Sequence, residues 1–72
     1  MNKTIAISGG FDPVHVGHLN MIKDAAKYGS VIVILNSDDW LVRKKGYAFM
    51  TFEERKAILE AFADVHHVVS VD

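Results

Sequence analysis

The chain has 72 residues, half of them hydrophobic, with a formal net charge of −1 and no cysteine. This length allows one small domain, residues 1–72, and the hydrophobic share is too high for a disordered segment. The lack of cysteine excludes disulfides and fits a cytoplasmic location, the charge gives no general attraction to nucleic acid, and no apolar run is long enough to span a membrane.

The first two predicted elements are a strand and a helix. Thr4–Ser8 is a short, partly β-branched run closed by two glycines, which predicts a buried strand. Over residues 17–28 the apolar residues recur with helical spacing. Leu19, Ile22 and Ala26 fall on one face, which we expect to be the buried one.

The middle of the chain contains a second strand and a connection. Val31–Asn36 is a continuous, β-branched apolar run, as expected of a strand covered on both faces. Residues 37–49, SDDWLVRKKGYAF, are polar and contain a glycine. We interpret them as a connection between the second strand and the next helix.

The last third predicts a helix and a strand. Thr51 and Glu54 have the spacing of a capping box, which predicts a helix start there and a helix that runs to about Phe62. Its expected buried residues are Ile58, Leu59 and Phe62. His66–Val71 then predicts a third strand, in which His66 and His67 are interpreted as structural.

The resulting order is β-α-β-α-β. Such alternation is typical of a parallel sheet with helical crossovers, and a three-strand unit of this kind is half of a doubly wound nucleotide-binding fold. The sequence therefore predicts an α/β, Rossmann-like half-domain.

The stretch GGFDPVHVGH, residues 9–18, joins the first predicted strand to the first predicted helix. In open α/β sheets ligands bind beyond the carboxyl ends of the strands, and helix N-termini attract phosphate. Gly9 and Gly10 allow close approach of the backbone, and His15 and His18 can each donate a ring N–H to one phosphate group. The stretch predicts a phosphate-binding loop.

Other interpretations of the histidine pair stay open at this point. A pair with this spacing can also be two ordinary surface or core histidines. A zinc site is disfavoured because no third ligand of a suitable type lies nearby in the sequence.

The same stretch resembles the G-x-F-D-x-x-H-x-G-H signature of the nucleotidyltransferases related to cytidylyltransferases. The segments NSDDWLVRKKG and FEERKAIL are similar to the second conserved region of the branch that contains glycerol-3-phosphate and ethanolamine-phosphate cytidylyltransferases and heptose-phosphate adenylyltransferases. The resemblance covers the whole chain and implies the N-terminal half of a fold with strand order 3-2-1-4-5. The signature is also akin to that of the longer class I aminoacyl-tRNA synthetases, but nothing here indicates tRNA binding.

The resemblance implies transfer of a nucleoside monophosphate from CTP or ATP to a small phosphorylated acceptor, a sugar, polyol or amino-alcohol phosphate. Pyrophosphate would leave, and Mg²⁺ would accompany the triphosphate. Such a reaction depends on positioning and charge stabilisation more than on a protein nucleophile.

The resemblance also implies roles for residues of the loop. His15 and His18 would hold triphosphate oxygens. Asp12 would lie near the magnesium triphosphate or the acceptor, unless it is only a turn-forming residue. The cradle would be shaped by Gly9, Gly10, Phe11 and Gly17, although Gly17 can also be a simple helix-entry glycine.

Lys44 and the Glu54–Arg55 pair match the second conserved region. Lys44 would bind the acceptor phosphate or the triphosphate, with Lys45 beside it, unless both belong to a solvated basic loop. Arg55 would either reach a phosphate from the first turn of its helix or serve a structural role. Trp40 is interpreted as packing rather than as cover for a ligand.

The family's last two strands and its final signature rich in Ser, Thr and Arg have no counterpart in these residues. Because the fourth strand would flank the first, Thr4–Ser8 is expected at a sheet edge. We therefore keep two hypotheses: an enzyme that is complete only in a longer or assembled form, and a non-catalytic half-domain that binds nucleotide phosphates or oligomerises. Both are compatible with a homo-oligomer or with completion by another chain.

Overall fold

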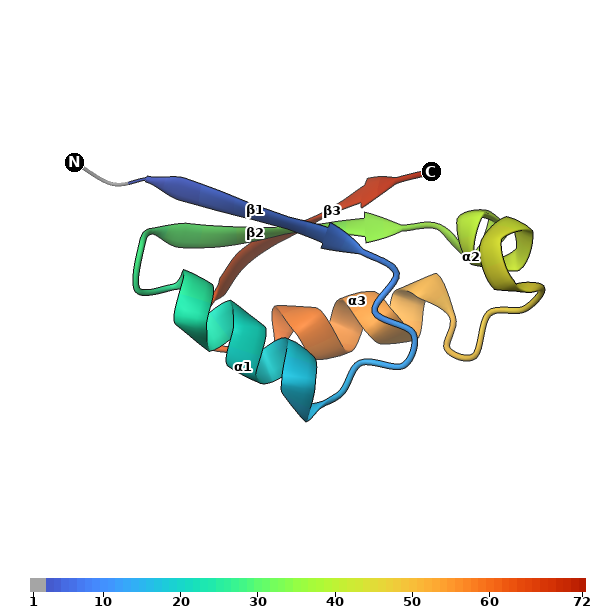
Figure 1. Cartoon of the computed structure of the whole chain (residues 1–72), viewed down its shortest axis with the longest axis horizontal. Coiled ribbons are helices and arrows are strands. Elements are labelled where there is room, and N and C mark those ends of the chain that lie inside the picture. The colour runs from blue at the N-terminus through green and yellow to red at the C-terminus, as the bar shows by residue number, and fades with distance from the viewer. Residues whose placement is uncertain (1–2) are drawn as a thin grey trace.

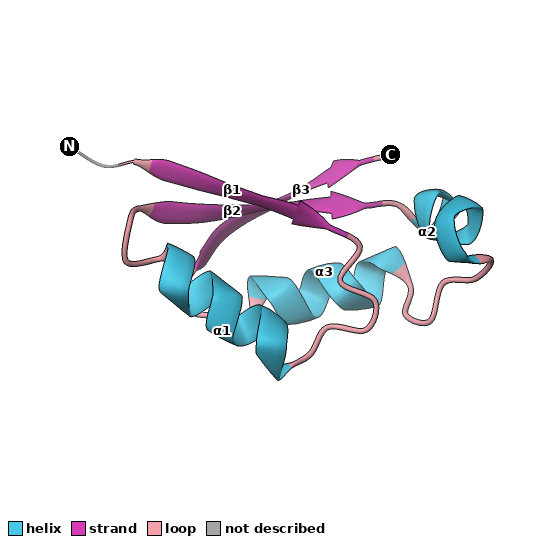
Figure 2. Cartoon of the chain, viewed as in Figure 1, coloured by secondary structure: helices cyan, strands magenta, loops and turns pink. Residues whose placement is uncertain are grey.

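Residues 3–72 of the chain are described by a computed structural model in which strands alternate with helices (Figure 1, Figure 2). In chain order the elements are β1 (Thr4–Gly9), α1 (Val16–Ala25), β2 (Ser30–Asn36), α2 (Asp38–Lys45), α3 (Phe52–Glu60) and β3 (Val65–Val71). The strands form one parallel sheet in the order β1-β2-β3. The predicted fold class and strand order are therefore confirmed.

The parallel register brings the carboxyl ends of the strands to one edge of the sheet. Gly9 at the end of β1 lies opposite Leu35 of β2, and Asn36 at the end of β2 lies opposite Val71 of β3. The loops that follow β1 and β2 therefore start side by side, which is the position where open α/β sheets bind ligands.

The hydrophobic core lies on one face of the sheet, between the strands and the helices α1 and α3 (Figure 1). The fully buried apolar side chains of this core are Ile22, Val31, Val33, Leu35 and Leu59. On the opposite face of β2, Ile32 and Ile34 are only partly buried. The prediction that β2 is covered on both faces is wrong for this chain, because both helices pack on the same side.

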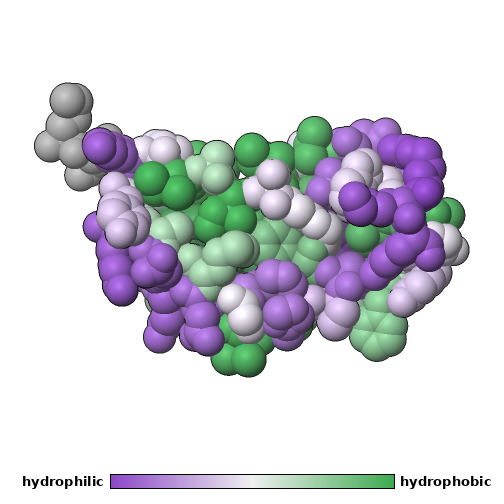
Figure 3. Space-filling view, in the orientation of Figure 1, coloured by the Kyte–Doolittle hydropathy of each residue, from purple (hydrophilic) through white to green (hydrophobic). Residues whose placement is uncertain are grey.

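Strand β1 lies at an edge of the sheet, as predicted. Its burial alternates between exposed and partly buried residues along Thr4–Gly9, so the prediction of a buried strand is wrong. Apolar residues reach the surface along the sheet side of the molecule (Figure 3). Among residues 3–72, no helix combines the length and the apolar character needed to cross a membrane.

Helix α2 occupies most of the segment that we interpreted as a connection. The Ser37 hydroxyl accepts a hydrogen bond from the Trp40 N–H and caps the helix start, and Gly46 ends the helix with a left-handed φ of 90°. Acidic residues lie in its first turn and basic residues in its last. These charges complement the helix dipole and favour a helix in spite of the polar composition.

The predicted start of α3 is confirmed, and its expected end is two residues too far along the chain. The Thr51 hydroxyl accepts from the Glu54 N–H at 3.2 Å, and the helix ends at Glu60. Of its expected buried residues, Leu59 is fully buried, whereas Ile58 is 39% exposed. Ile58 is therefore an incorrect core assignment.

Candidate functional site

The connection between β1 and α1 makes a sharp turn at the carboxyl end of the sheet. Phe11 has a positive φ of 51°, which is uncommon for a residue with a large side chain, and the Asp12–Pro13 peptide bond is cis. The Phe11 ring is buried in the core cluster. A side chain at Gly9 would approach this ring to 3.3 Å, so the turn and the glycine fit each other.

His15 caps the first turn of α1. Its backbone is extended, with φ of −145°, and its Nδ1 accepts the Gly17 N–H at 3.0 Å. A Cβ atom at Gly17 would lie 2.7 Å from the His15 ring. Gly17 therefore leaves the space in which the capping ring sits.

His18 completes a reciprocal arrangement with His15. The His15 N–H donates to the His18 Nδ1 at 3.2 Å, and the two rings stack with centroids 4.0 Å apart. Both Nδ1 atoms thus act as acceptors, so the neutral rings carry their proton on Nε2. Within residues 3–72 neither Nε2–H has a protein partner, which leaves two N–H donors available at the N-terminus of α1.

The environment of His18 favours its neutral form. Partial burial, and secondarily the charge of His15, lower the pKa of His18 from its ordinary value of 6.5. The Phe11 ring packs against it with centroids 4.6 Å apart. At neutral pH the His18 ring is therefore a neutral N–H donor.

A pocket of about 210 Å³ opens beside this histidine. It is lined by Ser8, Gly9, Gly10, Phe11, His18 and Met21. A Cβ atom at Gly10 would lie 2.7 Å from Leu41 and 3.5 Å from Trp40, because α2 packs closely over the loop. The structure therefore brings together most of the predicted cradle at the carboxyl end of β1.

Asp12 contacts the loop between α2 and α3. Its carboxylate, only 1% exposed, accepts the N–H groups of Phe49 and Met50, both at 2.6 Å, and forms an ion pair with Lys45 at 2.8 Å. Burial raises the pKa of Asp12, but the ion pair and the two N–H donors outweigh it and lower the pKa below 3.8. The carboxylate thus joins two loops by accepting N–H groups of the distant α2–α3 loop.

The two candidate lysines differ in their surroundings. Lys45 contacts Asp12 through the ion pair and also donates to its main-chain oxygen at 3.0 Å. Lys44 is exposed, with its Nζ 5.2 Å from the centroid of the Trp40 ring. Of the pair, Lys44 is the one whose ammonium is available to a ligand.

Arg55 is fully buried, with an exposed fraction of 0%. Its guanidinium donates to main-chain oxygens and to the Asp38 carboxylate. Of the two roles left open by the sequence, these contacts favour the structural one, because a phosphate would have to displace buried partners. His66 and His67 are exposed on β3, at the opposite end from its carboxyl terminus.

The sequence of the chain matches a known protein family. A profile of the cytidylyltransferase-like family matches residues 6–72. The chain belongs to the cytidylyltransferase-like family.

The chain is also similar to three curated proteins. The chain is 31% identical over 68 residues to a glycerol-3-phosphate cytidylyltransferase of Bacillus subtilis, 29% over 70 residues to an FAD synthase of Ferroglobus placidus, and 37% over 70 residues to the bifunctional protein HldE of Haemophilus influenzae. These matches cover 93%, 97% and 93% of the chain. They span only 53%, 46% and 15% of the respective relatives.

A solved structure shows the same fold. The lipopolysaccharide core biosynthesis protein of Thermoplasma volcanium superposes with a TM-score of 0.85 at 22% identity. The superposition covers 100% of this chain and 59% of that protein.

Asp38 and the main-chain groups around Arg55 were not among the predicted site residues. An acid directly after the Ser37 cap was a visible signal, because Asp38 and Asp39 both stand where a helix start favours acids. Nothing in the sequence marks the oxygens of Gly10, Asn36 and Met50 as acceptors, since every residue carries such an oxygen.

Proposed function

We propose that the chain supplies the N-terminal half of a nucleotidyltransferase site. This site transfers CMP or AMP from CTP or ATP to a small phosphorylated acceptor and releases pyrophosphate. The observation that carries the proposal is the reciprocal hydrogen bonding of His15 and His18, which leaves two Nε2–H donors at the N-terminus of α1, where His18 also lines a pocket with Gly9 and Gly10. The names of the similar proteins support a nucleotide and a phosphorylated acceptor as substrates.

The proposed reaction needs no protein nucleophile. An acceptor phosphate oxygen forms a bond to the α-phosphorus, the bond from that phosphorus to the bridging oxygen breaks, and pyrophosphate leaves with the electron pair. His15 and His18 would donate to triphosphate oxygens and stabilise the charge that develops there. Lys44 would bind the acceptor phosphate or the triphosphate as a point charge.

Magnesium is expected to accompany the triphosphate. Among residues 3–72, no three His, Asp or Glu side chains form a cluster suited to a metal ion. The carboxylates of Asp12 and Asp38 already pair with Lys45 and Arg55. Because Mg²⁺ is often held mainly by substrate phosphates, the triphosphate oxygens would be its main ligands.

A second candidate function is a non-catalytic half-domain that binds phosphates or self-associates. The observation that favours it is the edge position of β1, together with the open sheet face on which Val69 is 45% exposed. In this case triphosphate would bind or copies of the chain would associate, but no pyrophosphate would form.

The test combines calorimetry with an assay of pyrophosphate release. Magnesium CTP and magnesium ATP are titrated into the parent, His15→Ala and, as a matched control, the exposed His66→Ala. Loss of one hydrogen bond to a charged group predicts an affinity at least about tenfold lower for His15→Ala only. Equal affinity of all three proteins would contradict the phosphate site.

The enzymatic assignment is tested separately with a polyol phosphate, a sugar phosphate and an amino-alcohol phosphate as acceptors. Pyrophosphate release with one of them supports the first candidate. Binding without release supports the second, and absence of both binding and release contradicts the nucleotide assignment. In a form that turns over, Lys44→Gln should raise a substrate KM, whereas Lys23→Gln on α1 should not.

A further inference from the structure

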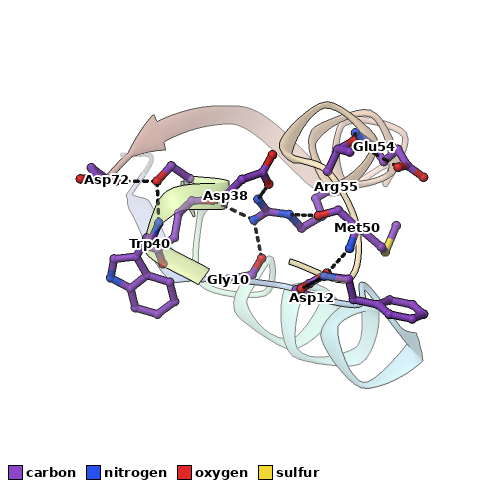
Figure 4. A network of polar contacts seen from close by, with 12 residues as sticks. Gly10, Asp12, Asp38, Trp40, Met50, Glu54, Arg55 and Asp72 are labelled. Carbon is purple, nitrogen blue, oxygen red and sulfur yellow. Dashed lines mark hydrogen bonds and ion pairs between the residues drawn. The ribbon is translucent and has the colours of Figure 1, made fainter. Parts of the chain in front are cut away.

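The guanidinium of Arg55 contacts four segments of the chain at once (Figure 4). Its Nε donates to the Met50 oxygen at 3.1 Å, its Nη1 to the Gly10 oxygen at 2.7 Å and the Asn36 oxygen at 2.8 Å, and its Nη2 to the Asp38 carboxylate at 2.6 Å. These four acceptors belong to the β1–α1 loop, the end of β2, the first turn of α2 and the loop before α3. The side chain thus joins the segments that follow β1 and β2 to the loop before α3.

Only the shape of arginine allows this set of contacts. A guanidinium is planar and presents five N–H donors in a fixed fork, whereas the ammonium of lysine has three donors at one point. The side chain of Arg55 is fully buried, so solvent does not compete for these donors. The four distances and the absence of exposure indicate that Arg55 fixes the relative positions of its four partners.

The peptide groups on both sides of Met50 are tied to the β1–α1 loop, one directly through Asp12 and one through Arg55 of α3. The Asp12 carboxylate accepts the Met50 N–H, and Arg55, which also holds Gly10, donates to the Met50 oxygen. Two side chains of opposite charge, Asp12 and Arg55, therefore link the loop before α3 to the loop that leads to the histidines. A displacement of one loop should displace the other.

We propose that Arg55 is a positioning residue that sets the spacing between the two halves of the site. One half is the loop at Gly10, which continues into the cap formed by His15 and His18. The other half is α2, whose first turn is bound through Asp38 and whose last turn carries Lys44. The functional part of this inference rests on the proposed function, but the positioning itself is testable without any ligand.

The test measures amide hydrogen exchange in the full chain. Arg55→Lys keeps the charge but loses the fork, and the exposed Arg43→Lys is its control. We expect Phe49 and Met50 amides in Arg55→Lys to lose protection by roughly tenfold more than the core amide of Val33. A merely stabilising role would lower protection at all three amides by the same factor, and that result would overturn the proposal.

A second pair of variants keeps the test decisive if Arg55→Lys does not fold. Asp38→Ala removes one partner of the guanidinium from a half-exposed position, and Asp39→Ala removes the neighbouring acid from the same helix turn. The Phe49 and Met50 amides should lose protection in Asp38→Ala and keep it in Asp39→Ala. Equal effects of the two variants would assign the loss to the helix terminus and contradict the role of Arg55.

The link to function is tested by titration with magnesium CTP and magnesium ATP. If the parent binds, Arg55→Lys should bind at least about tenfold more weakly, and Arg43→Lys within about twofold of the parent. Unchanged affinity in Arg55→Lys despite looser loops would overturn the functional part. If the parent binds neither nucleotide, the proposed function fails, while the exchange data still decide whether Arg55 positions the loops.

Discussion

Gly17 has no room for a side chain because the His15 ring occupies that space. In an ordinary helix, replacement of glycine by alanine stabilises by up to about 1 kcal/mol. Here the new Cβ would displace the ring and remove an N-cap that contributes about 1 kcal/mol. We therefore expect Gly17→Ala to melt close to the parent temperature but to bind magnesium triphosphate at least about tenfold more weakly, as measured by calorimetry.

The matched variant for this prediction is His15→Asn. Asparagine is a good N-cap, so this variant should also keep its stability, and it should lose affinity because it has no Nε2–H. Full affinity of Gly17→Ala would show that the position of the ring does not matter for binding.

His18 gives the fold a dependence on pH. Its pKa is lowered by burial and then by His15, so the folded state binds a proton less readily than the unfolded chain, whose value is 6.5. The contribution of this pKa shift to the unfolding free energy is complete above pH 6.5. It is lost as the pH falls through the lower pKa that His18 has in the folded state. Asp12 and Asp72 titrate at lower pH than His18, since their pKa values are lowered from 3.8.

Urea unfolding at about pH 7.5 and about pH 5.5 measures this effect. The parent should lose unfolding free energy between the two conditions, and His18→Gln should lose less of it. His66→Gln, a change at an exposed position, should behave as the parent does. The same loss in the parent and in His18→Gln would contradict the assignment.

The Asp12 carboxylate is one of two side chains that hold the loop between α2 and α3, the other being Arg55. Asp12→Asn would remove the ion pair with Lys45 and turn one acceptor oxygen into a donor that faces a main-chain N–H. Because the Asp12 side chain is 1% exposed, we expect a loss of about 2 to 3 kcal/mol in the unfolding free energy. Chemical denaturation provides the measurement.

The control for that carboxylate is Asp24→Asn on α1. Asp24 forms an exposed ion pair with Lys27 at 3.3 Å, and such pairs contribute about 0 to 1 kcal/mol. If Asp12→Asn lowered the unfolding free energy no more than Asp24→Asn does, the two loops would not depend on the buried carboxylate.

The elements differ in how well the sequence predicted them, and the reasons are physical. The strands and α3 follow apolar runs and a capping box, so their existence was predictable. Helix α2 was missed because its composition is polar, although Ser37, the two acids after it and Gly46 are all helix-end signals. The left-handed turn at Phe11 has no signal in the sequence, because a large side chain rarely adopts a positive φ, and the burial of its ring in the core is a tertiary contact.

The order of the strands was predictable from the sequence, but the coverage of the sheet was not. An apolar run such as Val31–Asn36 indicates that a strand is buried without saying which layer covers each face. Helices α1 and α3 pack on the same face, so within residues 3–72 no other element covers the second face or the edge at β1. The position of the histidines was predictable from their motif, whereas the contacts of Arg55 depend on residues far apart in the sequence.

The open edge and face lead to a prediction about association. Ala6 is exposed in the middle of β1, and Val69 and Val71 of β3 are 45% and 42% exposed. Unpaired edge groups beside apolar surface favour pairing with another copy of the chain. We therefore expect sedimentation at micromolar concentration to show a dimer or larger species.

Ala6→Lys should shift the chain to a monomer, because a charged side chain on an edge strand opposes pairing with a second strand. Ala57→Lys makes the same change at an exposed position of α3 and should leave the association as it is. A parent that sediments as a compact monomer, with the Thr4–Ser8 amides strongly protected from exchange, would contradict the prediction. In that case the chain would protect the β1 edge without a partner, and the second candidate function would lose its support from this surface.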